Sequence, residues 1–154
     1  MSSVPRTSLT LAEAAPRLWD AWSTFQAVAY PGKVDIVTRE LVRILSGRLT
    51  RCSICRNTRV RAALDRGLDE TMVAGLDDLE AGQLSDRHKA ALRFARAFLI
   101  DPAAFGAVER EELLRHFTPE QVGELVLDLV RYRPGSKMTV AAGHEPADDE
   151  LVLI

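Results

Sequence analysis

The chain has 154 residues and only two cysteines, and its length is typical of one domain, so we expect a single domain over residues 1–154. Twenty Lys and Arg against 22 Asp and Glu leave a net charge of −2, which argues against nucleic-acid or membrane-surface partners. Two cysteines are too few for a disulfide-rich secreted scaffold. The first residues lack a secretory pattern and no apolar run is long enough for a membrane span, so we expect a cytoplasmic protein.

Apolar residues recur at helical spacing along most of the chain. In chain order, the predicted helices cover residues 16–29, 34–49, 50–66, 69–76, 85–99, 109–116, 118–132 and 136–142. An acidic stretch over residues 77–84 is typical of a loop. The apolar end, residues 151–154, is either mobile or docked on a neighbour. No two-residue period persists over the length of a strand, so the predicted fold class is all-α.

Several helix boundaries carry local signals. Pro16 is a candidate first helical residue, and Asp69 and Ser85 are candidate caps of the helices that they begin. Thr50 is the candidate cap of a helix that would stop at Gly67. The motif Thr118-Pro119-Glu120-Gln121 combines an N-cap, a proline at the first position and a capping-box glutamine. Pro134-Gly135 is expected to end the helix that this motif begins.

The two cysteines form a Cys-x-x-Cys motif, Cys52 to Cys55, which serves either dithiol redox chemistry or half of a zinc site. A zinc site needs two more ligands, and the chain has no second such motif. Its histidines, His88, His116 and His144, each stand alone, which argues against zinc. A third interpretation is that both cysteines are buried as small apolar side chains.

Local charge favours the redox interpretation. With Thr50 as the cap, both cysteines would lie at the start of a helix, where the helix dipole favours a thiolate. Arg51, Arg56 and Arg59 add positive charge nearby. Arg59 would follow Cys55 by one helical turn and share its face, and a close cation lowers the pKa of a thiol.

Glu40 lies twelve residues before Cys52, and Arg66-Gly67-Leu68-Asp69-Glu70 follows the Cys-x-x-Cys pair. In these features the chain resembles the carboxymuconolactone decarboxylase-like superfamily and, within it, the alkylhydroperoxidase D-like (AhpD-like) branch. Residues 90–99 and 118–127 resemble later helices of the family, so the resemblance covers residues 34–143. It implies an all-α, AhpD-like helical domain.

The resemblance implies a thiol-dependent antioxidant oxidoreductase with alkyl hydroperoxide reductase activity of the peroxiredoxin type. Cys55 would attack the peroxide, Cys52 would resolve it, and Glu40 would be the acid/base. The family places a histidine seven residues after the first cysteine, where this chain has Arg59, which stabilises a thiolate but stays protonated. The implied partners are a hydroperoxide and a thiol reductant, such as a lipoyl-bearing or thioredoxin-like protein, with no metal, flavin or haem cofactor.

Two alternatives remain because of Arg59: a decarboxylase-like enzyme of the same fold, or a non-enzymatic helical oligomer or redox sensor. The cysteine pair argues against the decarboxylase branch, which does not rely on it. Without the resemblance, Glu40 would be a solvated or ion-paired helix residue. His116 and His144 are candidates to replace the family's histidine, which relays protons together with the glutamate and the second cysteine. The resemblance implies a homo-oligomer, a trimer or hexamer, in which the aromatic stripe would lie in the core or an interface: Trp19, Trp22, Phe25.

Overall fold

The computed structural model describes residues 11–28, 32–141, 143 and 151–154. The α-helices of this part of the chain are α1 (Leu11–Ala14), α2 (Pro16–Val28), α3 (Ile36–Thr50), α4 (Ser53–Asn57), α5 (Arg61–Leu64), α6 (Glu70–Ala74), α7 (Asp86–Ile100), α8 (Ala107–His116) and α9 (Pro119–Ala141). A 3₁₀ turn, η1, covers Pro102–Ala104, and two short strands are β1 (Thr58–Arg59) and β2 (Val152–Leu153). The all-α class is confirmed.

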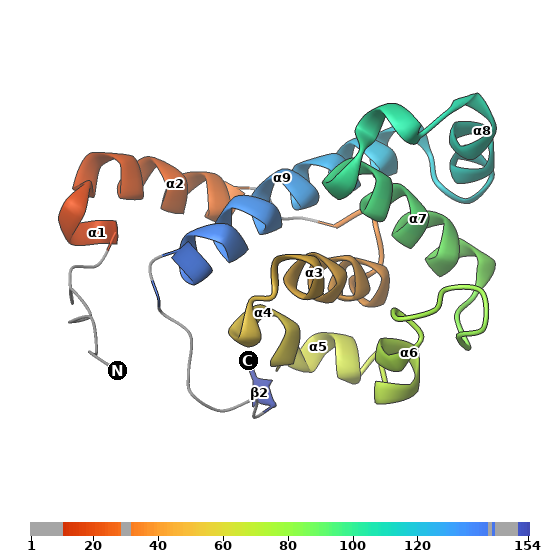
Figure 1. Ribbon diagram of the computed structural model, residues 1–154, viewed down its shortest axis with the longest axis horizontal. Coiled ribbons are helices and arrows are strands. Elements are labelled where there is room, and N and C mark those ends of the chain that lie inside the picture. The colour runs from red at the N-terminus through yellow and green to blue at the C-terminus, as the bar shows by residue number, and fades with distance from the viewer. Residues whose placement is uncertain (1–10, 29–31, 142, 144–150) are drawn as a thin grey trace, which may run out of the picture.

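Helix α3 lies at the centre of the fold and packs against α4, α7 and α9 (Figure 1). Its side chains are buried along most of its length, with Leu41, Val42 and Ile44 fully enclosed. Each apolar side chain of this size contributes about 1.5–3 kcal/mol when it leaves water. Arg39 and Glu40, each 2% exposed, are buried together with these apolar side chains, and each therefore needs a partner there.

Helices α1 and α2 extend from the helical body as an arm that reaches α9 (Figure 1). One contact between α2 and α9 is a hydrogen bond that Arg131 donates from its Nε to the side-chain oxygen of Gln26. Leu18 on the same arm is 74% exposed. The arm is thus held at one end and leaves apolar side chains in solvent.

Several of the helix starts that carry a local signal are confirmed. Helix α2 begins at Pro16, and Ser85 caps α7 by accepting a hydrogen bond from the His88 N–H. At the start of α9 the capping box is complete: the Thr118 hydroxyl accepts from the Gln121 N–H, and the Gln121 side chain accepts from the Thr118 N–H. These contacts join residues three positions apart, so the sequence pattern alone predicts them.

The predicted helix over residues 50–66 is wrong. Thr50 ends α3 instead of capping the next helix, and its hydroxyl donates to the Ser46 carbonyl. Arg51 then adopts a left-handed conformation, with φ of 57°, and the chain turns back on α3. Cys52 becomes the N-cap of α4, which ends after five residues at Asn57.

The predicted end of the helix over residues 118–132 is also wrong. Helix α9 continues through Pro134 to Ala141, so the described part of the separate turn or helix expected over residues 136–142 is its last part. Pro134 removes one backbone hydrogen bond from the helix. Packing on both sides of the proline maintains the helix, because Ser136 is buried and Tyr132 packs against the core.

The chain end pairs with the segment that follows the cysteines. Strand β2 lies parallel to β1, with Thr58 opposite Val152 and Arg59 opposite Leu153. The Ile154 N–H donates to the Arg59 carbonyl, so residues 151–154 dock on this chain itself. Among the described residues, no helix combines the length and apolarity needed to cross a bilayer.

Candidate active site

Cys52 and Cys55 are joined by a disulfide, with their Cα atoms 5.2 Å apart. Cys52 is fully buried, whereas Cys55 is partly exposed. As the N-cap of α4, Cys52 also accepts a hydrogen bond at Sγ from the Cys55 N–H, at 3.2 Å. The two cysteines therefore differ in access to solvent, a difference that the Cys-x-x-Cys motif by itself does not indicate.

Gly47 on α3 allows the cysteine turn to lie against that helix. A Cβ atom at this position would lie 2.8 Å from the Cys55 Cβ and 2.9 Å from the Arg56 nitrogen. Real carbon contacts are about 3.5–4.0 Å, so any larger residue would displace the turn. The glycine is needed here for close approach between two backbone segments.

Glu40 lies on the same helix, 2% exposed, and is bound by Arg43. Arg43 donates from Nε to Glu40 Oε2 and from Nη2 to Glu40 Oε1, both at 2.7 Å. The Val60 N–H donates to Oε1 at 3.0 Å. Arg43 also donates to the Cys55 carbonyl at 2.7 Å and to the Thr58 carbonyl at 2.5 Å. Glu40 thus reaches the cysteine turn through Arg43.

Arg59 does not share a helical face with Cys55, because α4 ends at Asn57 and Arg59 belongs to β1. Its side chain is buried and forms a two-point ion pair with Glu70, at 2.8 Å and 3.0 Å. Its Nη1 donates to the Arg56 carbonyl at 2.6 Å. The contacts of Arg59 therefore hold the loop after the cysteines in place.

Of the two histidines that could replace the family's histidine, only His116 lies in the described part of the chain. His116 contacts Glu112 at 3.2 Å on α8, and His144 lies outside the described residues. His88 is half-buried on α7, and this burial lowers its pKa, opposed by Asp35. Within the described ranges, no group of three or more His, Cys, Asp and Glu side chains is arranged to hold a metal ion.

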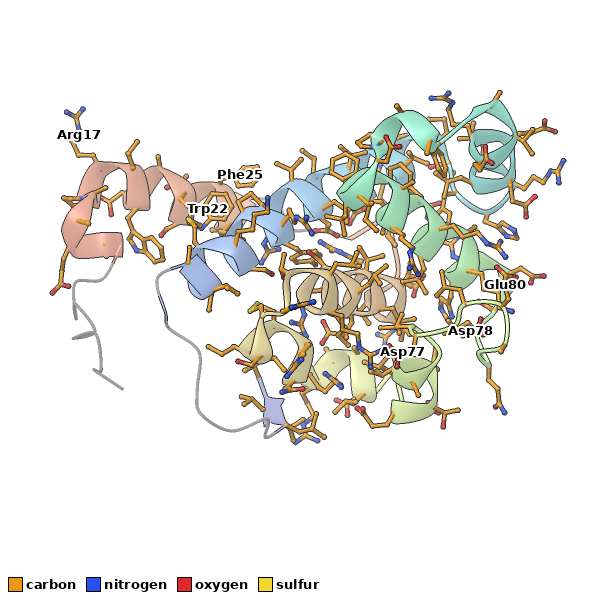
Figure 2. The ribbon with its side chains drawn as sticks, in the orientation of Figure 1. Arg17, Trp22, Phe25, Asp77, Asp78 and Glu80 are labelled. Atoms are coloured by element: carbon orange, nitrogen blue, oxygen red, sulfur yellow. A yellow bond between two sulfur atoms is a disulfide. The ribbon has the colours of Figure 1, made fainter. Side chains whose placement is uncertain are left out.

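A cavity of about 710 Å³ adjoins Cys55 and runs between α2 and α9. Its volume falls in the range typical of small-molecule sites. Trp19 and Trp22 line it from α2, and Tyr132 lines it from α9. Figure 2 shows Trp22 and Phe25 on the part of α2 that lies near α9, and their rings are 5.6 Å apart.

Of the two places expected for the aromatic stripe, the core is wrong for its first two members, and an interface stays a prediction. Trp19 is 38% exposed and Trp22 is partly exposed, and both border the cavity beside Cys55. The helical spacing correctly placed them on one face of α2. It could not show that this face meets α9 and Cys55, which are distant in the sequence.

Comparison with known proteins found no matching family model. Two uncharacterised proteins, from two strains of Mycobacterium tuberculosis, are each 34% identical to this chain over 118 residues. The match covers 76% of this chain and 41% of each relative, so the chain spans about two fifths of the length of the curated relatives it matches.

Several solved structures have the same fold. A protein of unknown function from Agrobacterium tumefaciens, provisionally described as antioxidant defence protein AhpD, matches with a TM-score of 0.74 at 14% identity, over 91% of this chain and 98% of that one. An uncharacterised peroxidase-related protein with an AhpD core, from Ralstonia eutropha, matches with 0.73 at 14% identity, over 90% and 75%.

A cysteine-to-alanine variant of the debrominase Bmp8, determined in complex with 2,3,4-tribromopyrrole, matches with a TM-score of 0.70 at 15% identity, over 88% of this chain and 73% of that one. At these identities the likeness concerns the fold. Together with the helical architecture around α3, it shows that this chain has the AhpD-like fold and carries a disulfide-bonded Cys52-x-x-Cys55 pair within it.

Proposed function

We propose that the protein is a thiol-dependent oxidoreductase that reduces organic hydroperoxides with the Cys52–Cys55 dithiol. The observation that carries this proposal is the asymmetry of the pair, because Cys55 borders the cavity and Cys52 is fully buried. A thiol that attacks a substrate must be reached from a pocket, whereas a resolving thiol only has to reach its partner sulfur. The AhpD-like fold supports the same assignment.

In the proposed cycle, the Cys55 thiolate attacks the terminal oxygen of the hydroperoxide and the O–O bond breaks. Cys55 becomes a sulfenic acid, and the departing alkoxide takes up a proton to become the alcohol. The Cys52 thiol then attacks the sulfenic sulfur, which forms the disulfide and releases water. A dithiol reductant, lipoyl-bearing or thioredoxin-like, restores both thiols by exchange and is itself oxidised to a disulfide.

Glu40 and Arg43 would position the cysteine turn and balance charge during this cycle. Arg43 is the group that joins the Glu40 carboxylate to the Cys55 carbonyl. In the reduced protein, Glu40 is our candidate to accept the thiol proton. Arg59 would act indirectly, by holding the loop through Glu70. We expect the protein to work as a homo-oligomer, a trimer or hexamer, and its solution mass tests this.

The decisive experiment measures consumption of cumene hydroperoxide by the reduced protein with dihydrolipoamide as the reductant. Cys55→Ser should abolish turnover, because no thiol then borders the cavity. Cys52→Ser should allow one reaction and leave a sulfenic acid on Cys55, which dimedone traps and mass spectrometry locates. Ser53→Ala is the matched control, since it changes one of the two residues between the cysteines and leaves both sulfurs in place.

The outcomes separate the alternatives. Turnover that persists in Cys55→Ser would refute the proposed role of this residue. Rapid oxidation of the thiols by peroxide without repeated turnover would favour a redox sensor. If peroxide does not oxidise the thiols, the remaining alternative is a non-redox protein of the same fold, either decarboxylase-like or non-enzymatic.

A further inference from the structure

We propose that the cavity beside Cys55 selects hydroperoxides with a bulky aromatic body over small alkyl hydroperoxides, and that Trp22 and Gly135 together determine this specificity. The inference rests on the proposed function, because it names the class of substrate for the same site. It depends on three features: the size of the cavity, the apolar side chains on its walls, and the contact between Trp22 on α2 and Gly135 on α9.

The size and walls of the cavity favour a large apolar ligand. Its volume of about 710 Å³ is typical of sites for organic ligands much larger than hydrogen peroxide or a short alkyl hydroperoxide. Trp19 and Trp22 line it from α2, and Tyr132 and Met138 line it from α9. Aromatic side chains present large rigid surfaces that pack in stacked or edge-on contacts with another ring. These walls therefore favour a substrate that carries an aromatic ring.

The two arginines on the same walls already make hydrogen bonds within the protein. Arg43 holds the carboxylate of Glu40, and Arg131 donates to the side-chain oxygen of Gln26. An apolar ligand leaves these contacts in place, so its binding exposes no unsatisfied polar group of these side chains. The ligand class is therefore defined by shape and apolarity.

Gly135 allows the ring of Trp22 to lie against α9. The glycine lies inside that helix, directly after Pro134, and lines the cavity. A Cβ at this position would meet Cζ2 of the Trp22 ring at 3.9 Å, which is an ordinary van der Waals distance. Alanine therefore just fits. Any longer side chain has to displace the Trp22 ring or extend into the cavity, and both change the space that a ligand can occupy.

Trp22 and Cys55 border the same cavity from different helices. Figure 2 shows Trp22 on the part of α2 that lies near α9, and Cys55 lines the cavity from α4. A substrate whose ring packs on the Trp22 indole lies along the wall that α2 and α9 form. Its hydroperoxide group then points to Cys55. A small alkyl hydroperoxide reaches the same sulfur without this contact, so it gains no binding energy from the wall.

The test compares cumene hydroperoxide with tert-butyl hydroperoxide, which share a tertiary carbon and a peroxide group and differ by a phenyl ring in place of a methyl group. With dihydrolipoamide as the reductant, we expect kcat/KM to favour cumene hydroperoxide by about tenfold or more, because burial of each methylene-sized group is worth about fourfold. Gly135→Leu and Trp22→Ala should each bring this ratio close to one, mainly through the KM for cumene hydroperoxide. Gly135→Ala should retain most of the preference.

Gly123→Leu is the matched control for Gly135→Leu. It makes the same substitution in the same helix at an exposed position that does not line the cavity, where a Cβ would meet nothing within 4 Å. Leucine forms helices better than glycine, so neither variant should unfold α9. Gly123→Leu should keep the preference of the parent protein for cumene hydroperoxide. Turnover of tert-butyl hydroperoxide by Gly135→Leu reports whether its cysteine turn is intact.

A binding measurement separates this inference from the proposed function. Both tryptophans of the chain line the cavity, so the intrinsic fluorescence reports on its occupancy. We expect 2-phenyl-2-propanol, which carries no peroxide, to change this fluorescence saturably in the parent protein. Gly135→Leu should weaken the binding by about tenfold or more, and Gly123→Leu should not. Addition of tert-butanol at the same concentrations should give no saturable change.

The outcomes differ for the two claims. If the aromatic alcohol binds as expected but neither hydroperoxide is consumed, the proposed function fails and the ligand class stands. If both hydroperoxides are consumed with equal kcat/KM and the aromatic alcohol does not bind, the aromatic selectivity is refuted and the peroxidase proposal stands. A preference for cumene hydroperoxide that survives in both Gly135→Leu and Trp22→Ala would overturn the role of these two residues.

Discussion

Replacing Gly47 by alanine tests the closest contact in the candidate site. The new Cβ would lie 2.8 Å from the Cys55 Cβ and 2.9 Å from both the Arg56 nitrogen and the Cys55 carbonyl carbon. Because ordinary carbon contacts begin near about 3.5 Å, the turn must move by about 0.7 Å. Two of these atoms belong to the backbone, so rotation of a side chain cannot relieve the overlap.

The expected effect on stability is the difference between two opposing contributions. Overpacking of this kind costs about 1–3 kcal/mol, and we take the upper end because the backbone itself must shift. Alanine in place of glycine inside a helix recovers about 1 kcal/mol. The net loss of unfolding free energy is therefore about 2 kcal/mol, which corresponds to a Tm lower by about 4–8 °C.

Gly123 supplies the control, because a Cβ there meets nothing within 4 Å and the residue is exposed inside α9. Gly123→Ala should raise stability by about 0.5–1 kcal/mol, so the two alanine variants should differ by about 3 kcal/mol in urea unfolding. In Gly47→Ala, the displaced turn should also make buried Cys52 react faster with iodoacetamide after reduction. A Gly47→Ala protein as stable as Gly123→Ala would refute the close approach.

Three further predictions concern the rest of the fold. Asp128→Ala leaves Arg39, 2% exposed, without its two-point partner and should cost about 3–5 kcal/mol in urea unfolding, whereas the double change Asp128→Leu with Arg39→Met should recover much of this loss. Burial lowers the pKa of His88, so the unfolded chain binds the proton more tightly. Stability should then be complete above about pH 6.5 and fall below it, and His88→Gln should reduce this fall in melts from about pH 8 to 5. Thr118→Ala removes the cap that Gln121 completes and should lower stability by about 1 kcal/mol in the same assay, while equal stability would contradict the capping role.

The parts of the fold that the sequence predicted correctly depend on contacts between near neighbours in the chain. The capping box at Thr118 and the caps of α6 and α7 are hydrogen bonds across three residues, at Asp69 and Ser85 respectively. Their patterns are complete in the sequence, so tertiary packing only has to leave them undisturbed. The resemblance likewise placed Glu40 and the cysteines in one region, where Arg43 connects them.

The wrong predictions concern places where distant segments decide the backbone. Residues 50–66 have an acceptable helical pattern, yet Arg51 adopts a left-handed conformation and the turn folds back onto Gly47. The packing of the cysteine turn against α3 offsets the strain of about 1–2 kcal/mol that a non-glycine residue has in the left-handed conformation. In the same way, Pro134 does not end α9 because its flanking residues pack against the rest of the fold.

The sequence by itself determined the all-α class, the capped helix starts at Asp69, Ser85 and Thr118, and a cysteine pair whose spacing permits a disulfide. Only the tertiary structure decided that Cys55 faces the cavity while Cys52 is buried, and that Arg59 pairs with Glu70 instead of lying beside Cys55. The reason is physical. Periodicity and capping arise from residues within one or two helical turns, whereas burial and ion pairing depend on which distant helices pack together. The site is formed where α2, α4 and α9 meet, and no pattern within one segment of the sequence predicts that these helices come together.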